Sequence, residues 1–289
     1  MTFVPEVHIT YPFVADRGRL GNQLFQIAST VGIAAKVDAK PIFGHWDYRP
    51  VFSFPGFLFP ELKRYTFSDM NAINSYEEQF VPHLHPQERA FLRDYSLFEE
   101  VAPTIKEWVQ PSRKARESLG KVMQALPPLH SAVAIHVRRG DRIGLPEGVL
   151  PLTSIEYYQE AVRQFPADQH FLVFSDDIAW CKDNLGVLDR DLTFVTGKPR
   201  PSDREDYIKS SPTDWPDMQL MSMCGGGQII SNSTYAWWGA FASSADRVYY
   251  PASWVGYRLH KDCQGWMDPS LMFPKAWTEL DNPTAGACV

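Results

Sequence analysis

Two adjacent arginines and an aspartate form the first candidate for chemistry in this sequence. Arg138 and Arg139 precede Asp141, and His136 stands two residues before them. A guanidinium group presents a rigid fork of N–H donors that matches phosphate oxygens. We therefore interpret this segment as a phosphate-binding element. A surface ion pair between Arg139 and Asp141, worth less than about 1 kcal/mol, is the alternative.

Two further polar runs suit the other parts of a nucleotide. The carboxylates of Asp176 and Asp177 can accept hydrogen bonds from a base or from ribose hydroxyls. The run Ser231 to Thr234, which contains Ser233, offers hydroxyls at a predicted helix start. Unpaired backbone N–H groups and the helix dipole favour an anion there. Helix capping is the alternative role for both runs, and it does not exclude ligand contact.

A glycine-containing loop near the N-terminus is a further candidate. The stretch GRLGNQ at 18–23 lacks the G-x-G-x-x-G fingerprint, so it is a weak phosphate signal by itself. Its glycines allow the backbone to approach a ligand closely. Arg19, Asn22 and Gln23 add polar side chains at a strand-to-helix turn. We expect the loop to face a cleft, and a purely structural left-handed turn is the alternative.

The three C-terminal runs can meet only if the elements before them form one sheet. Short apolar runs predict strands at 132–137, 170–175, 192–195, 228–230 and 247–250, and helical patterns are predicted at 153–165, 176–184, 217–224 and 233–245. This alternation is typical of a doubly wound parallel sheet with helices on both faces. Ligands bind such sheets at the carboxyl ends of the strands, where the polar runs fall. A Pro- and charge-rich stretch, 197–216, interrupts the pattern.

The N-terminal half repeats the alternation less regularly. A strand at 7–14, a helix at 24–37 and a strand at 41–46 make one predicted βαβ unit. At about 100–200 residues per domain, the length of 289 residues suggests two domains. We predict an α/β fold with two domains, 1–130 and 131–289, facing each other across a cleft. The tail from residue 281 is expected to be loose.

An aromatic segment after this unit allows two interpretations. Six aromatic residues lie in one Pro-broken stretch: Trp46, Tyr48, Phe52, Phe54, Phe57 and Phe59. They either pack in a core or form a platform for a sugar ring, because pyranose faces pack against aromatic rings. The platform would place Trp46 and Tyr48 on the acceptor side, with Asp16 nearby. Trp237 and Trp238 are expected in the core.

Composition excludes several classes of protein. The 28 Lys and Arg residues stand against 34 Asp and Glu residues, a net charge of −6, which argues against the basic footprint that duplex nucleic acid requires. No apolar stretch approaches the roughly 18 residues of a membrane span, so a cytoplasmic location is expected. Four cysteines without a C-x-x-C pair predict buried or incidental thiols: Cys181, Cys224, Cys263 and Cys288.

Four motifs carry a family resemblance. They are GRLGNQLFQIAS at 18–29, HVRRGDR at 136–142, FSDDIAWCKDN at 174–184, and DMQLMSMC followed by SNSTYAWWGAF at 217–241. In this order they resemble the α-1,2-fucosyltransferases of bacterial type, glycosyltransferase family 11, within the group that contains the α-1,6- and protein O-fucosyltransferases. The run Gly225-Gly226-Gly227 departs from the relatives, which carry bulkier residues there. We expect it to loosen the turn into Gln228.

The resemblance implies a GT-B-type fold with two Rossmann-like domains. The C-terminal domain would hold GDP-fucose, and the N-terminal domain would help form the acceptor side. It also implies inverting transfer of L-fucose from GDP-β-L-fucose to the 2-hydroxyl of a terminal galactoside, with no metal ion and no cofactor. The acceptor would be a galactose-terminated oligosaccharide or glycan, and a lipid-linked glycan would allow peripheral association with a membrane.

Roles for individual residues follow from the matched motifs. Arg138 is implied as the essential arginine on the diphosphate, with His136 and Asp141 in the same pocket and Asn22 facing the reacting sugar. Asp176, Asp177 and Asp217 resemble guanosine contacts. The remaining donor-binding residues implied are Arg19, Gln23, Arg139, Ser233 and Thr234.

The proton of the acceptor hydroxyl has no single assigned base. General-base logic requires a carboxylate or imidazole within hydrogen-bond reach, and Asp16, Asp141 and Glu147 are candidates. Transfer to water or to the leaving oxygen along a dissociative path is the alternative. Arg138 and the helix start at Ser233 are suited to stabilise the charge that develops on the diphosphate.

Two other protein classes fit part of the sequence. A metal-dependent glycosyltransferase needs an Asp-x-Asp motif after a strand, whereas Asp189-Arg190-Asp191 precedes its predicted strand. A non-catalytic nucleotide-sugar or glycan-binding protein would bind the donor without releasing GDP. The absence of a Walker-type G-x-x-x-x-G-K-[ST] argues against a nucleotide hydrolase.

Overall fold

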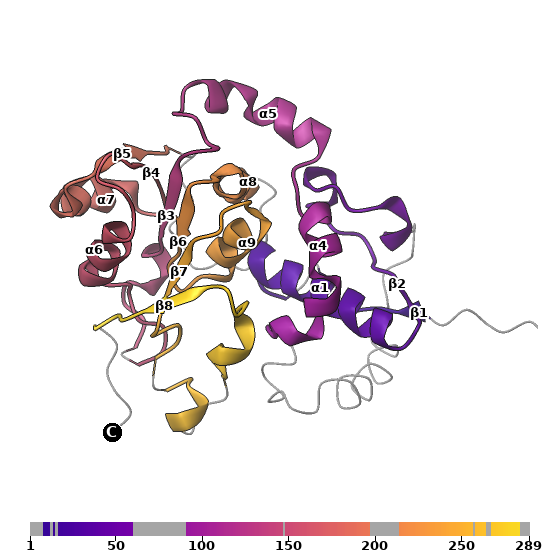
Figure 1. The fold of residues 1–289 in the computed structure, drawn as a ribbon. Coiled ribbons are helices and arrows are strands. Elements are labelled where there is room, and N and C mark those ends of the chain that lie inside the picture. Colours follow the sequence, from indigo (N-terminus) through magenta and orange to yellow (C-terminus); the bar gives the residue numbers. More distant parts are fainter. Residues whose placement is uncertain are drawn as a thin grey trace, which may run out of the picture.

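A six-stranded parallel sheet organises the C-terminal part of the chain (Figure 1). The computed structural model describes residues 8–11, 14, 17–59, 91–146, 148–196, 214–256, 258–263 and 267–283. The strands are β3 (Val133–Val137), β4 (His170–Ser175), β5 (Asp191–Phe194), β6 (Gly227–Ile229), β7 (Val248–Pro251) and β8 (Thr278–Leu280).

The spatial order of these strands is β5-β4-β3-β6-β7-β8, and every neighbouring pair is parallel. The chain therefore starts in the middle of the sheet at β3, winds outward to β5, and returns to place β6 on the other side of β3. This reversal creates a topological switch point between β3 and β6, where open α/β sheets bind ligands. The predicted α/β class with a doubly wound parallel sheet is confirmed.

Alternate residues of β3 face two different layers of the core. Val133, Ile135 and Val137 pack with the helix α6 (Ile155–Arg163), whereas Ala134 belongs to the core shared with α8 (Trp215–Met223) and α9 (Thr234–Ala242). The strand is buried along its whole length. A parallel strand that is covered on both faces has a continuous apolar sequence. This is the pattern from which the strand at 132–137 was predicted.

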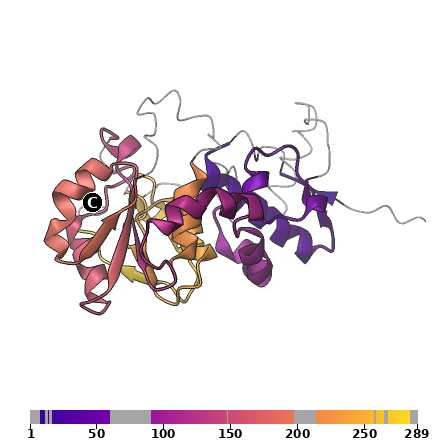
Figure 2. The ribbon, with the colours of Figure 1, turned by 90° about the horizontal axis from the view of Figure 1, so that it is seen from above.

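Helices cover both faces of the sheet. α6 and α7 (Ile178–Asn184) lie on one side, and α8 and α9 lie on the other, between the sheet and the N-terminal part (Figure 2). Ser154 and Asp177 cap α6 and α7, because their side chains accept hydrogen bonds from Tyr157 N and Trp180 N. These helices and their caps confirm the predictions for 153–165 and 176–184.

The N-terminal part contains one parallel pair with its crossover helix. β1 (His8–Ile9) pairs with β2 (Lys40–Pro41), and α1 (Leu20–Lys36) connects them. α1 packs on α9, since the ring of Phe25 lies 4.6 Å from that of Trp237 and 5.2 Å from that of Trp238. Both tryptophans are buried, as predicted. The division at residues 130 and 131 stays a prediction.

Several elements differ from the predictions in extent. α1 begins at Leu20 rather than Leu24, with Arg19 as its extended N-cap residue, so Asn22 and Gln23 lie in the first helical turn and not in a loop. β1 and β2 have two residues each and are shorter than predicted. The sequence patterns did not indicate β8, α4 (Ala102–Trp108) or α5 (Arg113–Gln124). All but residues 214–216 of the Pro-rich stretch lie outside the described ranges.

Short 3-10 turns complete the described ranges. They are η1 (Arg49–Val51), η2 (Gly56–Leu58), η3 (Tyr95–Leu97), η4 (Glu99–Val101), η5 (Gly140–Arg142), η6 (Leu185–Leu188), η8 (Lys261–Cys263) and η9 (Pro269–Met272). Of these, η5 matters most for the site, because it follows β3 closely and carries Asp141 and Arg142.

The three consecutive glycines before β6 tighten the fold, contrary to the predicted loosening. A Cβ atom on Gly225 or Gly226 would lie 2.5 Å from His130 O or 2.3 Å from Ser131 O. Their N–H groups instead donate to Leu129 O and Ala132 O at 3.0 Å each. The glycines are thus required by the close approach of two backbone segments.

The predicted loose tail is anchored at its start. Asn282 is buried, and its Oδ1 accepts a hydrogen bond of 2.8 Å from Ser154 N, the residue that caps α6. This contact corrects the prediction for residues 281–283, whereas residues 284–289 lie outside the described ranges. The contact holds the end of β8 against the start of α6.

Two of the predicted thiols, Cys181 and Cys224, are buried and form no disulfide bond. Burial raises the pKa of Cys181 to about 11 and that of Cys224 to about 12. They are therefore held as neutral thiols at pH 7, which confirms the prediction of buried thiols for these two.

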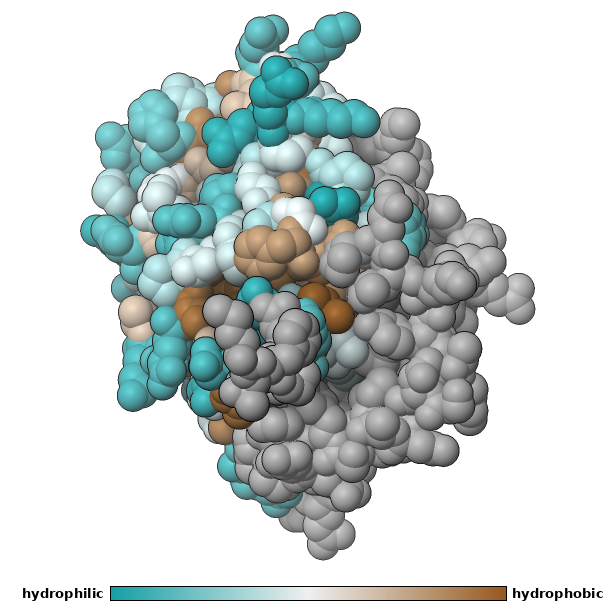
Figure 3. All heavy atoms as spheres, turned by 90° about the vertical axis from the view of Figure 1, so that its right-hand side faces the viewer, coloured by the Kyte–Doolittle hydropathy of each residue, from teal (hydrophilic) through white to brown (hydrophobic). Residues whose placement is uncertain are grey.

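Hydrophobic side chains are present at the described surface in small numbers, and they do not form a membrane-spanning helix. No helix within the described ranges has the length and hydrophobicity to cross a bilayer. On the face that lies to the right in Figure 1, hydrophilic side chains surround a small group of hydrophobic residues next to atoms drawn in grey (Figure 3). The exposed large hydrophobic side chains, such as Phe57 and Val187, belong to different elements, which is normal for a protein surface.

Candidate active site

A cavity of about 210 Å³ opens at the switch point, where the ends of β3 and β6 meet the start of α1. Four arginines and two aspartates contribute to its wall, so its charged lining has an excess of positive charge. Its charged and hydroxyl-bearing lining residues are Arg19, Arg93, Arg138, Asp141, Arg142, Asp214, Ser233, Thr234 and Tyr235. The polar runs that follow β3 and β6 therefore meet in space, as predicted, in a cavity suited to an anion.

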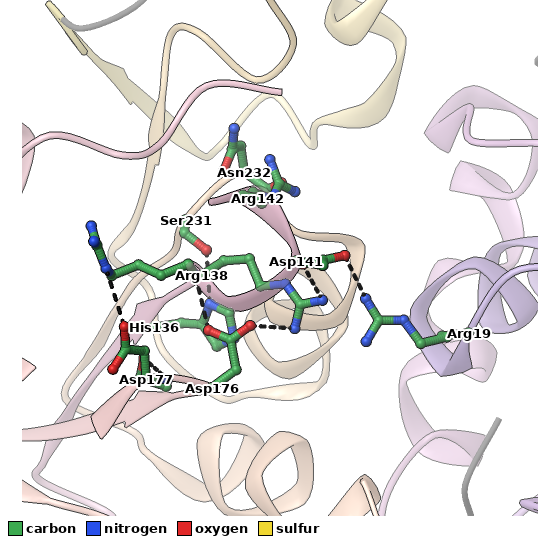
Figure 4. A network of polar contacts seen from close by, with 11 residues as sticks. Arg19, His136, Arg138, Asp141, Arg142, Asp176, Asp177, Ser231 and Asn232 are labelled. Atoms are coloured by element: carbon green, nitrogen blue, oxygen red, sulfur yellow. Dashed lines mark hydrogen bonds and ion pairs between the residues drawn. The ribbon is translucent and has the colours of Figure 1, made fainter. Parts of the chain in front are cut away.

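Arg138 is fixed between two carboxylates. It directly follows β3, and its side chain is only 6% exposed. Its Nη2 lies 2.6 Å from Asp141 Oδ1, and its Nη1 lies 2.8 Å from Asp176 Oδ2 (Figure 4). The two carboxylates fix the orientation of the Arg138 guanidinium group. Its remaining N–H donors are therefore preorganised for an anion in the cavity.

Asp176 forms an ion pair with Arg138 and is not part of the cavity wall. Its side chain is 3% exposed, and its Oδ1 accepts a hydrogen bond of 2.9 Å from Arg139 N. Burial acts to raise the pKa of Asp176, but the charge of Arg138 and the hydrogen bond from Arg139 N outweigh it, so the pKa lies below its usual value. In this geometry Asp176 holds Arg138 and Arg139 in place, and its predicted contact with guanosine stays a prediction.

Asp141 joins the N-terminal and C-terminal parts. Its Oδ2 lies 3.2 Å from Nη2 of Arg19, the N-cap residue of α1, while its Oδ1 faces Arg138 (Figure 4). One carboxylate thus lies between two guanidinium groups that come from segments 119 residues apart in sequence, from Arg19 to Arg138. These contacts bring Arg19, Arg138 and Asp141 together at the cavity, and their roles in donor binding and catalysis stay predictions.

Arg142 and Asn232 line the same cavity, and the motif-derived site assignments did not include them. Nη2 of Arg142 donates to Asn232 O at 2.6 Å, and Nδ2 of Asn232 donates to Pro151 O at 2.8 Å. Burial lowers the pKa of Arg142 to about 10, and the neighbouring charge of Arg138 acts in the same direction. Both residues lie inside the quoted motifs, which was the signal available for finding them.

Three buried polar atoms around the cavity make neither a hydrogen bond nor an ion pair within the described part of the chain. They are Oδ1 of Asn22, Nη1 of Arg142 and Oδ1 of Asn232. A buried polar group without a partner is costly and unusual in a native protein. All three residues line the cavity, so a bound polar ligand would supply the missing partners.

The N-termini of two helices converge on the cavity. α1 and α9 begin side by side, because a Cβ atom on Gly21 would lie 2.6 Å from both Thr234 C and Tyr235 N. Ser233 is the N-cap residue of α9, but its side chain makes no capping hydrogen bond, so capping does not explain it. Unpaired N–H groups and the positive ends of both helix dipoles therefore lie near the anion-binding arginines.

Two predicted donor-binding residues support the site without facing it. His136 is buried, and its Nδ1 lies 2.8 Å from Ser231 Oγ, which ties the end of β3 to the end of β6. Gln23 is also buried, and its Oε1 accepts a hydrogen bond of 2.8 Å from Trp46 Nε1. Neither side chain is part of the cavity wall, and their predicted contacts with the donor stay predictions.

Arg139 turns away from the cavity, although it is adjacent to Arg138. Its guanidinium carbon lies 3.8 Å above the ring of Trp180, and its Nε lies 3.5 Å from Asp177 Oδ2. Asp177 also caps α7. Asp217 lies in the first turn of α8 and is not part of the cavity wall. Donor contacts for Arg139, Asp177 and Asp217 therefore stay predictions.

Most of the aromatic segment packs in the core. Trp46 is 2% exposed and Tyr48 is 0% exposed, and the ring of Trp46 stacks on those of Phe52 and Phe59, whereas Phe57 is exposed. The burial of Trp46 and Tyr48 favours the core interpretation, and their predicted acceptor contacts stay a prediction. Asp16 and Glu147 lie outside the described residues.

Arg93 and Asp214 line the cavity, and no sequence motif pointed to them. Arg93 follows Leu92, a buried residue whose φ of 53° is unusual for a side chain of this size. Ser29 Oγ donates to Leu92 O at 2.9 Å, which holds this turn against α1. Backbone strain of this kind persists where the surrounding structure enforces it, and here it directs an arginine to the cavity.

The Asp-x-Asp sequence lies at the opposite edge of the sheet. Asp191 begins β5, and its Oδ2 lies 2.6 Å from Nδ1 of His170, which begins β4. Both residues are therefore at the amino ends of their strands, away from the cavity. Among the residues that the structure describes, no group of three or more His, Cys, Asp or Glu side chains could hold a metal ion.

The sheet order and the cavity define a doubly wound α/β protein with an arginine-lined cavity at its switch point. The sequence profile of the glycosyl transferase family 11 matches residues 62–258, and the chain belongs to this family.

Individual relatives agree with this assignment. The chain is 33% identical over 138 residues to the O-antigen biosynthesis glycosyltransferase WbnK of Escherichia coli, covering 43% of this chain and 39% of the relative. It is 24% identical over 249 residues to the galactoside alpha-(1,2)-fucosyltransferase 2 of Gorilla gorilla gorilla (80% and 69%). It is 32% identical over 124 residues to an alpha-1,2-colitosyltransferase of Escherichia coli (40% and 38%).

These alignments span between 38% and 69% of the length of the curated relatives. Among solved structures, NodZ α-1,6-fucosyltransferase soaked with GDP-fucose is 14% identical with a TM-score of 0.47, covering 83% of this chain and 93% of that chain.

Proposed function

We propose that this chain transfers L-fucose from GDP-β-L-fucose to the 2-hydroxyl of a terminal galactoside, with inversion at the sugar and without a metal ion. The observation that carries this proposal is the position of Arg138, fixed by Asp141 and Asp176 at the switch point beside the starts of α1 and α9. The names of the relatives support the linkage, since both the gorilla enzyme and the colitosyltransferase form α-1,2 linkages.

The chemical demand of the reaction matches this site. When the bond between fucose C1 and the diphosphate breaks, the sugar becomes oxocarbenium-like and the diphosphate gains negative charge. Arg138, Arg142 and Arg19 surround the cavity that would receive this charge. Preorganised donors of this kind contribute roughly 3–4 kcal/mol each to transition-state stability. The arginines and helix N-termini would supply the positive charge that a divalent cation supplies in metal-dependent enzymes.

The cavity fits only part of a nucleotide sugar. Its volume of about 210 Å³ is below the roughly 300–1,000 Å³ of pockets that enclose whole drug-sized ligands. We assign it to the diphosphate and the fucosyl ring. The guanosine would then extend past the end of β4 and the start of α7, where Asp177 is partly exposed.

Incubation of the purified chain with GDP-fucose and a panel of β-galactosides tests the proposal. The expected result is GDP release that depends on a galactoside, at an unchanged rate in excess EDTA, and a product whose new linkage is α-1,2 by NMR. Release of GDP without any acceptor product, or activity that EDTA abolishes and Mg²⁺ restores, would contradict it. Binding of GDP-fucose without turnover on any acceptor would favour the non-catalytic alternative.

The donor sugar needs a parallel test, because one relative is a colitosyltransferase. The same acceptors should be offered with the corresponding colitose donor, which lacks the 3-hydroxyl of fucose. A higher kcat/KM for the fucose donor supports the proposal. A higher kcat/KM for the colitose donor would mean that colitose is the sugar transferred, while the proposed α-1,2 linkage would remain. The proposal places the enzyme in the cytoplasm, acting on free or lipid-linked glycans.

A further inference from the structure

The side-chain amide of Asn232 is fixed in one orientation at the cavity wall. Its Nδ2 donates to Pro151 O at 2.8 Å and to Trp254 O at 3.2 Å, which uses both of its N–H groups. The reversed amide would place an oxygen against these two carbonyl oxygens, so the hydrogen bonds determine which atom is Oδ1. Asn232 is 2% exposed, and its Oδ1 accepts no hydrogen bond within the described part of the chain. The cavity wall therefore contains an acceptor without a donor.

The missing partner of Asn232 Oδ1 must be a hydrogen-bond donor, because a buried carbonyl oxygen left without one is costly. The diphosphate of a nucleotide sugar has only acceptor oxygens at pH 7, so an amide oxygen repels it. Hydroxyl groups can donate, and in the proposed donor they belong to the fucosyl ring and to the ribose. The residues around Asn232 favour one of these two sugars.

Asn232 lies where the cationic part of the cavity wall meets its apolar part. Nη2 of Arg142 donates to Asn232 O at 2.6 Å, so the backbone of Asn232 borders the arginines (Figure 4). The side chain of Asn232 is bound to the carbonyl groups of Pro151 and Trp254. Apolar residues of the cavity wall lie at or next to these two carbonyl groups in sequence: Leu150, Trp254 and Val255. A ligand at this junction meets positive charge on one side and apolar surface with one acceptor on the other.

This junction suits the bond that the proposed reaction breaks, which joins a phosphate to a sugar. Fucose is a 6-deoxyhexose, so its ring carries a methyl group as well as hydroxyl groups, and these match an apolar wall that contains an acceptor. Nη1 of Arg142 is also buried without a partner, and it is suited to donate to the adjacent phosphate. The ribose has hydroxyl groups but no methyl group, and the diphosphate separates it from the fucosyl ring.

We infer that Asn232 is a specificity-determining residue for the donor sugar, and that its Oδ1 accepts a hydrogen bond from a ring hydroxyl of the fucosyl group. A donor that lacks this hydroxyl leaves Oδ1 buried and unpaired, so the site discriminates against it. The contact is made in the bound donor and involves no covalent change. This inference rests on the proposed function and deepens it, since it assigns a residue that recognises the sugar.

Donor analogues that each lack one hydroxyl test the contact by calorimetry. The probes are GDP, GDP-fucose and the 2-deoxy, 3-deoxy and 4-deoxy analogues of GDP-fucose, each titrated into the wild-type chain. We expect at least one analogue to bind about 5- to 100-fold more weakly than GDP-fucose. Equal affinity for GDP-fucose and all three analogues would mean that no sugar hydroxyl meets Oδ1, as when a buried water molecule pairs with it, and would overturn the inference.

Two variants at the same position separate the acceptor from the structural role of the amide. Asn232→Ala and Asn232→Asp both lose the donated bonds to Pro151 O and Trp254 O, but only Asn232→Asp keeps an oxygen that can accept from the sugar. The preference for GDP-fucose over the sensitive analogue should fall to within about twofold in Asn232→Ala and persist in Asn232→Asp. A merely structural role would weaken GDP, GDP-fucose and the analogue by the same factor, so a preference retained in Asn232→Ala would overturn the inference.

Asn184→Ala is the matched control. Nδ2 of Asn184 also donates to a backbone carbonyl, Trp180 O at 2.8 Å, but Asn184 is not part of the cavity wall. Every Kd in this variant should stay within about twofold of the wild-type value. Thermal unfolding checks that each variant folds.

Failure of the inference is distinguishable from failure of the proposed function, because the readout is binding and not turnover. A wild-type chain that transfers fucose, with a hydroxyl preference that Asn232→Ala retains, overturns the role of Asn232 alone. A wild-type chain that binds neither GDP nor GDP-fucose overturns the proposed function and the role of Asn232 together.

Discussion

Gly21 of α1 packs directly against the backbone of Thr234 at the start of α9, so closely that a Cβ atom on Gly21 would lie 2.6 Å from the carbonyl carbon of Thr234. This contact sets the distance between the N-terminal part and the parallel sheet. It also places the two helix N-termini on either side of the anion-binding cavity, since both Gly21 and Thr234 line it.

Gly21→Ala is therefore expected to disrupt the site. The added methyl group meets backbone on α9, which cannot rotate away, and overpacking of this kind costs typically 1–3 kcal/mol. We expect a lower free energy of unfolding in urea and a fall in donor affinity. Gly120→Ala is the control, because Gly120 lies in α5 with open space around it and alanine there should raise stability by about 0.5–1 kcal/mol. Equal stability of Gly21→Ala and the wild type would contradict the close contact.

Arg138→Lys is expected to be nearly inactive. A lysine keeps the charge but cannot contact Asp141, Asp176 and a phosphate in one plane, because its ammonium group is a single point. We expect kcat/KM for fucosyl transfer to fall by at least about 100-fold. Arg113→Lys, at a position that is 94% exposed, should leave kcat/KM unchanged. Turnover by Arg138→Lys at the wild-type rate would remove Arg138 from the mechanism.

Asp176 is expected to link stability to pH. Its pKa in the folded chain lies below that of the unfolded chain, so its contribution to stability is complete above the unfolded value of about 3.9 and is lost as the pH falls through the folded value. Urea unfolding between pH 3 and pH 7 should show this acid loss in the wild type and a smaller one in Asp176→Asn. The Asn variant should also be less stable at pH 7 by roughly 1.5–3 kcal/mol, since it removes one of the two carboxylates that hold the buried Arg138 guanidinium. An identical pH dependence of the two proteins would refute the assignment.

Arg93→Ala is expected to weaken donor binding without unfolding the chain. The guanidinium lines the cavity, and a hydrogen bond to a charged group is worth roughly 1.5–3 kcal/mol, so the Kd for GDP-fucose should rise about 10- to 100-fold. Calorimetry with GDP and with GDP-fucose would locate the contact. A rise with both ligands points to the diphosphate, and a rise with GDP-fucose alone points to the sugar. Unchanged affinity for both ligands would show that Arg93 takes no part in donor binding.

The sequence determined which residues form the sheet and which motifs follow its strands. Apolar runs such as 170–175 predict buried parallel strands because a strand covered on both faces must be apolar throughout. Arg138, Asp141 and Ser233 could be chosen because polar residues after such strands fall at one edge of the sheet. These are local signals, and they do not depend on how distant segments pack.

Only the tertiary structure decided which side chains face the cavity. Arg138 and Arg139 are adjacent in sequence, yet one is held at the cavity by two carboxylates and the other lies over Trp180. Successive residues at a strand end point to opposite sides, so sequence spacing alone could not say which of the two arginines faces the ligand. Tyr48 and Asp214 are 166 residues apart and meet because α1 and the aromatic core dock on the sheet. Such a contact depends on the packing of two distant segments, which no local pattern records.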